Sequence, residues 1–87
     1  MEDREIRIEV VVWIDSKIEI GEFDYGEEFE YATMKSVGFV VFENELIVTL
    51  AQDSREDEDT YRTTITIPKK CVIDRNVVYI IPSVTEV

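Results

Sequence analysis

The stretch "SVGFVVFENELIVTLAQDS" (residues 36–54) decides the fold, because it holds two apolar runs separated by only three polar residues. Apolar side chains recur at every second position in both runs, which is the period of a β-strand. The polar break centres on Asn44, and asparagine tolerates positive φ. Two strands joined by so short a connection are antiparallel neighbours. We therefore predict a central hairpin in which Gly38, Val40 and Phe42 share one face of the first strand.

Strand patterns continue on both sides of this hairpin. They cover residues 4–14, 60–67 and 76–81. In the first of these segments the even-numbered side chains are apolar: Ile6, Ile8, Val10, Val12 and Ile14. They alternate with Glu5, Arg7 and Glu9, as expected of a half-buried strand. The pattern predicts that the even-numbered face is the buried one, and that the other face is covered as well over residues 10–13, which are apolar on both faces.

The connections between the strands differ greatly in length. Residues 15–35 form a long acidic loop, within which residues 17–23 have the pattern of a short strand. Pro68 ends the fourth strand because proline has no amide proton, and the PKKCVI segment that starts there has the length of one 3₁₀ turn. This order predicts one all-β domain over residues 1–87. We expect a small antiparallel five-stranded barrel, SH3-like or Sm-like, with a long first loop and a single 3₁₀ turn before the last strand.

Composition excludes several classes of function. The formal net charge is −11, from 20 acidic and 9 basic residues, so we expect no direct binding to nucleic acid and no attraction to anionic membranes. The chain has no histidine and a single cysteine, Cys71. These counts exclude an intramolecular disulfide, a zinc site built on histidine, and Ser-His-Asp or Cys-His catalysis. With no glycine-rich phosphate loop and no EF-hand pattern either, we expect a protein without enzymatic activity, cofactor or metal.

The expected location follows from the first residues and from the longest apolar runs. The N-terminal residues are charged and lack the pattern of a signal peptide. The longest apolar run is about five residues, far below the roughly 20 that a membrane-spanning helix needs. We expect a cytoplasmic protein with no membrane span.

The last strand predicts self-association. It is apolar at five consecutive positions, from Val77 to Ile81. A strand in the wall of a small barrel alternates between an inner and a wet face, so continuous apolarity indicates that the outer face is covered as well. Two covers remain open, the long acidic loop and another subunit. The small core available to 87 residues favours a homo-oligomer.

Four fragments together resemble a known group of proteins. They are "VVWIDS" (residues 11–16), "SVGFVV" (36–41), "LIVTLAQDS" (46–54) and "TIPKKCVI" (66–73). Their motifs and spacing resemble small accessory proteins of tailed bacteriophages and prophages, most of which have no assigned function. The resemblance implies a role inside an infected bacterium, in counter-defence. Some small phage proteins are oligomers that sequester nucleotide messengers of bacterial immunity, and others are acidic inhibitors that mimic DNA or cap a host enzyme.

The first functional hypothesis is sequestration of a small nucleotide-like messenger by an oligomer. Its candidate ligand-binding residues are Trp13, Ser36, Gly38, Tyr61, Arg62 and Lys69. In this hypothesis an aromatic ring stacks on the base, the two cations hold phosphate, the serine donates a hydrogen bond and the glycine admits the ligand to the backbone. The plainer interpretation makes Trp13 a core anchor or subunit contact, and Arg62 and Lys69 surface cations that balance acids.

The alternative hypothesis is an acidic inhibitor of a basic host protein. Its candidate contact residues lie in two acidic loops: Glu22, Asp24, Tyr25, Glu27, Glu28, Phe29, Asp53, Glu56, Asp57 and Asp59. Aromatic side chains would anchor the partner while carboxylates steer its approach. The competing structural interpretation is that Phe23, Phe29 and Tyr31 fold back onto the barrel. A structural or adaptor component of a phage particle is a third possibility.

Overall fold

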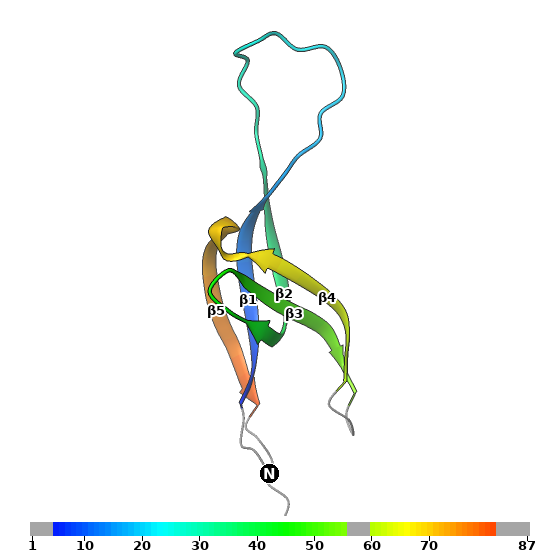
Figure 1. The fold of residues 1–87 in the computed structure, drawn as a ribbon, viewed down its shortest axis with the longest axis vertical. Coiled ribbons are helices and arrows are strands. Elements are labelled where there is room, and N and C mark those ends of the chain that lie inside the picture. Colours follow the sequence, from blue (N-terminus) through cyan, green and yellow to red (C-terminus); the bar gives the residue numbers. More distant parts are fainter. Residues whose placement is uncertain (1–4, 56–59, 82–87) are drawn as a thin grey trace, which may run out of the picture.

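The computed structural model describes residues 5–55 and 60–81, and these form five strands and one short helix (Figure 1). The elements are β1 (Ile6–Asp15), β2 (Ala32–Glu43), β3 (Ile47–Ser54), β4 (Tyr61–Pro68), the 3₁₀ helix η1 (Lys69–Cys71) and β5 (Val72–Ile81). The predictions of an all-β chain, a central hairpin, a long first loop and a single 3₁₀ turn before the last strand are confirmed. This part of the chain contains no helix of the length and apolarity needed to cross a bilayer.

The five strands form one antiparallel sheet in the order β4-β3-β2-β1-β5. The chain therefore runs as a meander from β1 to β4 and then returns through η1 to the far side of β1 (Figure 1). Among the described residues no ladder joins β4 to β5, so the sheet is not closed into the barrel that the sequence predicted.

The turn between β2 and β3 is built by Asn44. Its side-chain Oδ1 accepts hydrogen bonds from the amides of Leu46 (2.8 Å) and Ile47 (3.0 Å), which is the local bonding that favours asparagine in tight turns. The carbonyl of Leu46 in turn accepts a hydrogen bond of 2.8 Å from the amide of Lys69. This bond ties η1 to the hairpin and places the start of β5.

The hydrophobic core is small. Its buried members are Val11, Val48, Leu50, Ala51 and Ile67. Trp13, Val40 and Val72 are partly buried and pack against this cluster. The packed cluster around Leu50 thus joins β1, β2, β3 and β4 to the start of β5.

The buried face of β1 is the odd-numbered one, so the predicted face of this strand is wrong, although the cover expected on the odd-numbered face over residues 10–13 is present at Val11. Val11 is fully buried and Glu9 is 3% exposed, whereas the even-numbered residues from Ile6 to Ile14 are only half-buried. The physical reason is that Glu9 has two cationic partners, Arg7 and Arg75, which the local sequence does not reveal.

A bulge in β2 overturns a second predicted face. The register with β3 shifts between Val40 and Phe42, so one extra residue interrupts the alternation. Phe42 therefore points outward and is exposed, although it was expected to share the face of Gly38 and Val40. The same bulge turns Glu43 inward, opposite the buried Val48.

Residues 16–31 form an extended arm that leaves the sheet between β1 and β2 (Figure 1). The last pair before the arm joins Asp15 to Ala32. Within the arm, which the structure describes throughout, a backbone hydrogen bond runs from the amide of Glu27 to the carbonyl of Asp24 (3.2 Å) and forms a local turn, and no strand is formed. The short strand predicted for residues 17–23 is therefore absent.

Candidate functional site

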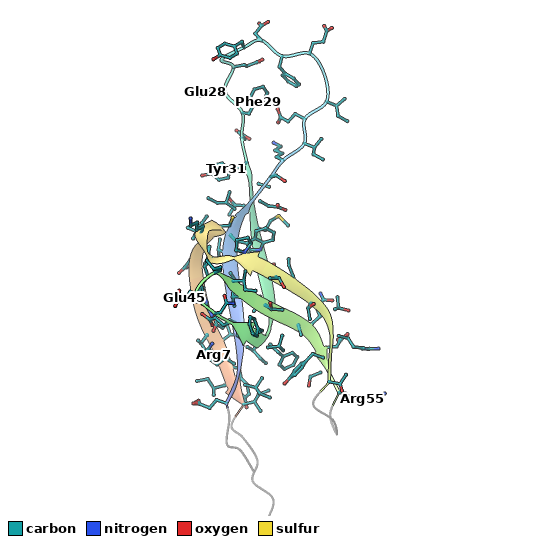
Figure 2. The ribbon with its side chains drawn as sticks, in the orientation of Figure 1. Arg7, Glu28, Phe29, Tyr31, Glu45 and Arg55 are labelled. Atoms are coloured by element: carbon teal, nitrogen blue, oxygen red, sulfur yellow. The ribbon has the colours of Figure 1, made fainter. Side chains whose placement is uncertain are left out.

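The arm exposes a row of apolar side chains well away from the core. They are Ile18, Ile20, Phe23, Tyr25, Phe29 and Tyr31. Tyr25 is fully exposed and Ile20 is 95% exposed. Figure 2 shows Glu28, Phe29 and Tyr31 on the limb of the arm that returns to β2, beyond the end of the sheet. The interpretation in which the arm's aromatic rings fold back onto the barrel is therefore wrong.

Carboxylates alternate with these apolar side chains. The arm carries Glu19, Glu22, Asp24, Glu27, Glu28 and Glu30, against the single cation Lys17. The Nζ atom of Lys17 lies 3.5 Å from Glu19 and 3.6 Å from Glu30, so it links the two limbs near their base. The remaining carboxylates leave the outer part of the arm strongly negative.

Local contacts shape the tip of the arm. The rings of Phe23 and Phe29 pack edge to face, with centroids 5.0 Å apart and an interplanar angle of 74°, a geometry that aromatic pairs favour. The amide of Asp24 donates to Oε2 of Glu27 at 3.1 Å. Because these contacts are internal to the arm, its tip has a defined shape that does not depend on the sheet.

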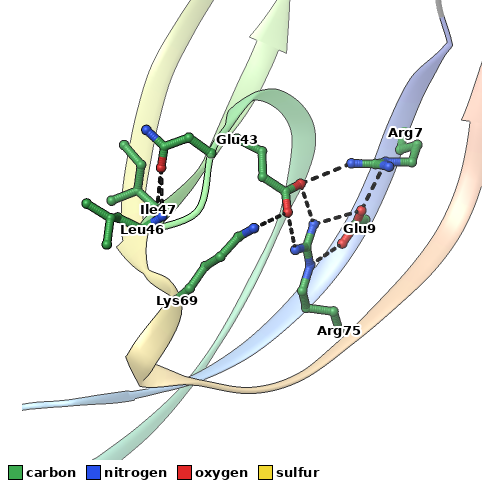
Figure 3. Close-up of polar contacts among 8 residues, drawn as sticks. Arg7, Glu9, Glu43, Leu46, Ile47, Lys69 and Arg75 are labelled. Carbon is green, nitrogen blue, oxygen red and sulfur yellow. Dashed lines mark hydrogen bonds and ion pairs between the residues drawn. The ribbon is translucent and has the colours of Figure 1, made fainter.

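A second cluster lies on the inner face of the sheet and consists of ion pairs (Figure 3). Arg75 on β5 stands at its centre. Its Nε atom donates to Oε1 of Glu9 at 2.8 Å, and its Nη1 atom donates to Oε2 of Glu43 at 2.8 Å. The guanidinium therefore bridges carboxylates from β1 and from the end of β2, using the fork geometry that arginine offers to carboxylates.

Two further cations complete the ion cluster. The Nζ atom of Lys69 lies 2.7 Å from Oε2 of Glu43. Arg7 contacts both carboxylates, with its Nε atom 3.2 Å from Oε2 of Glu9 and its Nη2 atom 3.2 Å from Oε1 of Glu43. Three cations thus surround two carboxylates, and the cluster is positive within a chain whose net charge is −11.

These contacts shift the proton equilibria of two members of the cluster. Hydrogen bonds from Arg75 and Lys69 lower the pKa of Glu43 to about 2. Hydrogen bonds to Glu43 and Glu9 raise the pKa of Arg75 above its ordinary value. Both groups are therefore charged over the physiological range, and the cluster is a permanent clamp rather than an acid–base pair.

The ion cluster is the part of the structure that sequence reasoning missed. The one local sign of this cluster in the sequence was Glu9, a glutamate beside an apolar run. Arg75 is 66 positions away from Glu9 along the chain, so no spacing rule connects them. The bulge that turns Glu43 inward leaves no pattern of its own in the sequence.

The structure brings together two of the six predicted ligand-binding residues. The indole Nε1 atom of Trp13 donates to Oγ of Ser36 at 3.0 Å, while the ring packs against the core. Gly38 has a structural role nearby, because a Cβ atom there would lie 2.5 Å from the carbonyl oxygen of Ala51. The glycine thus lets β2 and β3 approach each other closely.

The other three predicted ligand-binding residues lie elsewhere. Arg62 pairs with Asp53 at 3.5 Å on exposed β-strand positions, and the ring centroid of Tyr61 is 6.3 Å from that of Phe39. Lys69 belongs to the ion cluster, at the opposite end of β4 from Arg62. The six residues do not converge on one site in the described chain.

The predicted protein-contact residues also separate into groups. Glu22, Asp24, Tyr25, Glu27, Glu28 and Phe29 are all on the arm. Asp53 is at the end of β3, and Glu56, Asp57 and Asp59 lie outside the described residues. Figure 2 places Arg55, which borders this second loop, at the far end of the sheet from the arm. A single flat partner surface does not span both loops.

Comparisons with known proteins do not assign this chain to a family. A scan against protein-family models and searches of curated proteins and of solved structures found no match to this chain. The resemblance to phage accessory proteins therefore stays a prediction. Within residues 5–55 and 60–81 no three His, Cys, Asp or Glu side chains gather as they would around a metal ion.

Proposed function

We propose that this protein is a non-enzymatic binding protein that engages a basic partner protein through its arm. The observation that carries the proposal is the arrangement of residues 16–31, which expose six large apolar side chains among six carboxylates. Exposed apolar groups of this kind, rimmed by charge, mark interaction sites in soluble proteins. None of these side chains packs into the core formed around Leu50.

The two kinds of side chain have different physical tasks in such a complex. Aromatic anchors such as Tyr25 and Phe29 bury large areas in partner pockets and account for most of the affinity. Carboxylates around them accelerate association with a positive surface and disfavour partners that are negative. The net charge of −11 extends this attraction beyond the arm.

The partner class that fits is a protein with a basic cleft, such as one that binds nucleic acid. A narrow, extended arm enters a cleft more readily than a flat surface, and its carboxylates meet the cations that otherwise hold phosphates. In this proposal the protein acts in the bacterial cytoplasm during phage infection, as the sequence resemblance implies, and it inhibits the host protein that it binds.

Charge reversal on the arm tests the proposal. The variant Glu22→Lys/Glu28→Lys changes two exposed arm carboxylates, and Glu5→Lys/Glu45→Lys makes the same change in charge at exposed positions outside the arm. Proteins captured from a bacterial lysate are identified by mass spectrometry, purified, and titrated against all three proteins by calorimetry. We expect the arm variant to bind at least tenfold more weakly and the control to bind as the wild type does. Equal affinities for the arm variant and the wild type would remove the arm from the function.

A second candidate is sequestration of an anionic nucleotide-like messenger. It is favoured by the excess of cations over carboxylates in the ion cluster that contains Lys69. Native mass spectrometry after incubation with a pool of bacterial nucleotide messengers tests it. Stoichiometric gain of small-molecule mass, lost in Lys69→Ala, supports sequestration, and an unchanged mass rejects it.

A further inference from the structure

The outer edge of β5 is open. The sheet order places β5 at one end, where β1 is its only paired neighbour in the described chain. An edge strand presents unpaired backbone donors and acceptors along its free side, and these pair readily with another strand. β5 is ten residues long, so this free edge is substantial.

The side chains in the second half of β5 are also apolar and exposed. Val77, Val78, Tyr79 and Ile80 are each between 45% and 60% exposed. Protein edges are normally protected by lysine, proline or inward charges. This chain has 29 charged residues by its composition (20 acidic and 9 basic), yet the five positions from Val77 to Ile81 contain none.

The arm does not cover this edge. Val77 lies opposite Glu9 and Ile81 opposite Ile6, at the start of β1. The arm leaves β1 after Asp15, at the other end of the strand. Asp15 is six positions from Glu9 along the strand, which is about 20 Å at ~3.3 Å per residue. Figure 1 shows the arm extending further away from this end.

The size of the core indicates what buries the apolar part of β5. Five buried hydrophobic residues form the core of the described chain, while sixteen large hydrophobic residues are exposed. Such a chain needs additional burial to be stable. Because folding requires this burial, the molecule that covers the apolar surface of β5 has to be present whenever the chain is present, and in equal amount. A second copy of the chain meets that condition.

We propose that two copies pair through β5 to form a two-fold dimer with a continuous ten-stranded sheet. The interface belongs to the sheet and does not depend on the arm or on its partner. The two-fold axis passes beside Tyr79, so that β5 of one copy runs antiparallel to β5 of the other.

The apolar side chains at the end of β5 favour this register. The pairing of β5 with β1 skips Val78, so the alternation of hydrogen-bonding type is interrupted there and does not by itself choose the axis. Centring on Tyr79 places Val77 opposite Ile81 and Val78 opposite Ile80. Every cross-strand pair is then apolar, and no carboxylate of one strongly acidic copy faces a carboxylate of the other.

The other open edge is a poorer match for β5. β4 is interrupted at Thr63, whose φ is 57°, and its pairing with β3 skips that residue. It ends at Pro68, which has no amide proton to donate. The pairing of β5 with β1 also skips two residues, Ile73 and Val78, so both open edges are irregular. What makes β4 the poorer partner is the missing amide donor at Pro68.

Light scattering after gel filtration tests the dimer. The variant Val78→Lys places a charge in the centre of the proposed interface, and Ile20→Lys makes a similar change on the arm as the matched control. We expect dimers for the wild type and for Ile20→Lys at micromolar concentration, and at least 100-fold weaker association for Val78→Lys. A wild type that is monomeric throughout, or that forms larger rings, overturns the proposal.

Cross-linking tests the register and does not depend on the folding of a charged variant. In a Cys71→Ser background, Tyr79→Cys places two thiols directly across the axis, about 5 Å apart between Cα atoms. Ile73→Cys, on the same strand, places them about 40 Å apart in the proposed register, at ~3.3 Å per residue. A short bismaleimide should therefore link Tyr79→Cys into covalent dimers and leave Ile73→Cys monomeric. Equal linking of both variants, or of Ile73→Cys alone, contradicts the register.

Discussion

At the residue scale, the arrangement of the inner face of the sheet depends on the burial of Glu9. A carboxylate that is 3% exposed would be strongly destabilising without partners, because its charge loses hydration. Arg75 supplies two hydrogen bonds to it, from Nε at 2.8 Å and Nη2 at 3.2 Å. The same guanidinium holds Glu43, so one side chain from the last strand fixes the first strand and the end of the second.

The lowered pKa of Glu43 predicts how the stability of the fold depends on pH. Its pKa is about 2 in the folded chain against an ordinary value of 4.5, so its contribution is complete above pH 4.5 and is lost as the pH falls towards 2. A pKa unit corresponds to about 1.4 kcal/mol. Because 26% of the side chain is exposed, solvent screening reduces the total, and we expect roughly 2 kcal/mol at pH 7.

The substitution Glu43→Gln isolates this contribution. Urea unfolding of the wild type and the variant at one protein concentration, between pH 7 and pH 2, gives the difference in unfolding free energy at each pH. We expect the variant to be less stable at pH 7 and the difference to vanish near pH 2. Glu45→Gln, at an exposed position in the same turn, is the control and should show no such trend. A difference that is constant with pH would contradict the role given to the Glu43 charge.

Gly38 gives a second prediction at the residue scale. In Gly38→Ala the new Cβ atom would lie 2.5 Å from the carbonyl oxygen of Ala51 and 3.2 Å from Cβ of Leu50. The oxygen is part of the backbone of β3, so relief requires the two strands to move apart. We expect a loss of about 2 kcal/mol or more, measured by urea unfolding. Val37→Ala, at an exposed neighbouring position, should cost much less, and equal costs would show that β2 and β3 have room to separate.

At the element scale, the arm should be separable from the sheet. Asp15 and Ala32 are directly paired, so an Asn-Gly turn can replace residues 16–31 between them and close a standard two-residue hairpin. The arm adds nothing to the core, and shortening the loop reduces its closure entropy by roughly 1–2 kcal/mol. We therefore expect the shortened chain to unfold at an equal or higher urea concentration.

The same shortened chain should fail to capture the basic partner. A shortened protein that does not fold would show that the arm supports the sheet. A folded shortened protein that still captures the partner would place the binding surface elsewhere. Circular dichroism and the lysate capture described above distinguish these outcomes.

The elements that the sequence predicted are those with local causes. Asn44 and the short polar break determine the central hairpin within a few residues, and Pro68 ends β4 where the 3₁₀ turn begins. The buried face of β1 was not predictable, because it depends on an ion pair with Arg75 on the last strand. The sequence identified the arm as a long acidic loop. Local sequence does not show whether such a loop packs on the core, so the separation of the arm from the core was not predictable.

At the scale of the whole molecule, the protein is elongated. The radius of gyration is 17.3 Å and the longest extent is 66 Å, whereas a compact chain of this length has a radius near 12 Å. The arm accounts for the length, since it continues the long axis of the sheet (Figure 1). An elongated shape exposes more surface per residue, which is why the core of the single copy is small.

The β5 dimer makes a prediction about the shape of the complete particle. The arm lies at the end of the sheet where β5 begins, beside Trp13 opposite Val72. Antiparallel pairing around Tyr79 places these two ends on opposite sides, so the arms point away from each other. Two 66 Å copies that overlap over five strand residues span on the order of 110 Å. Small-angle X-ray scattering should give a maximum dimension near that value for the wild type and a much shorter particle for the shortened chain. A dimer whose length is close to 66 Å would place both arms on one side, which two-fold pairing of β5 does not permit.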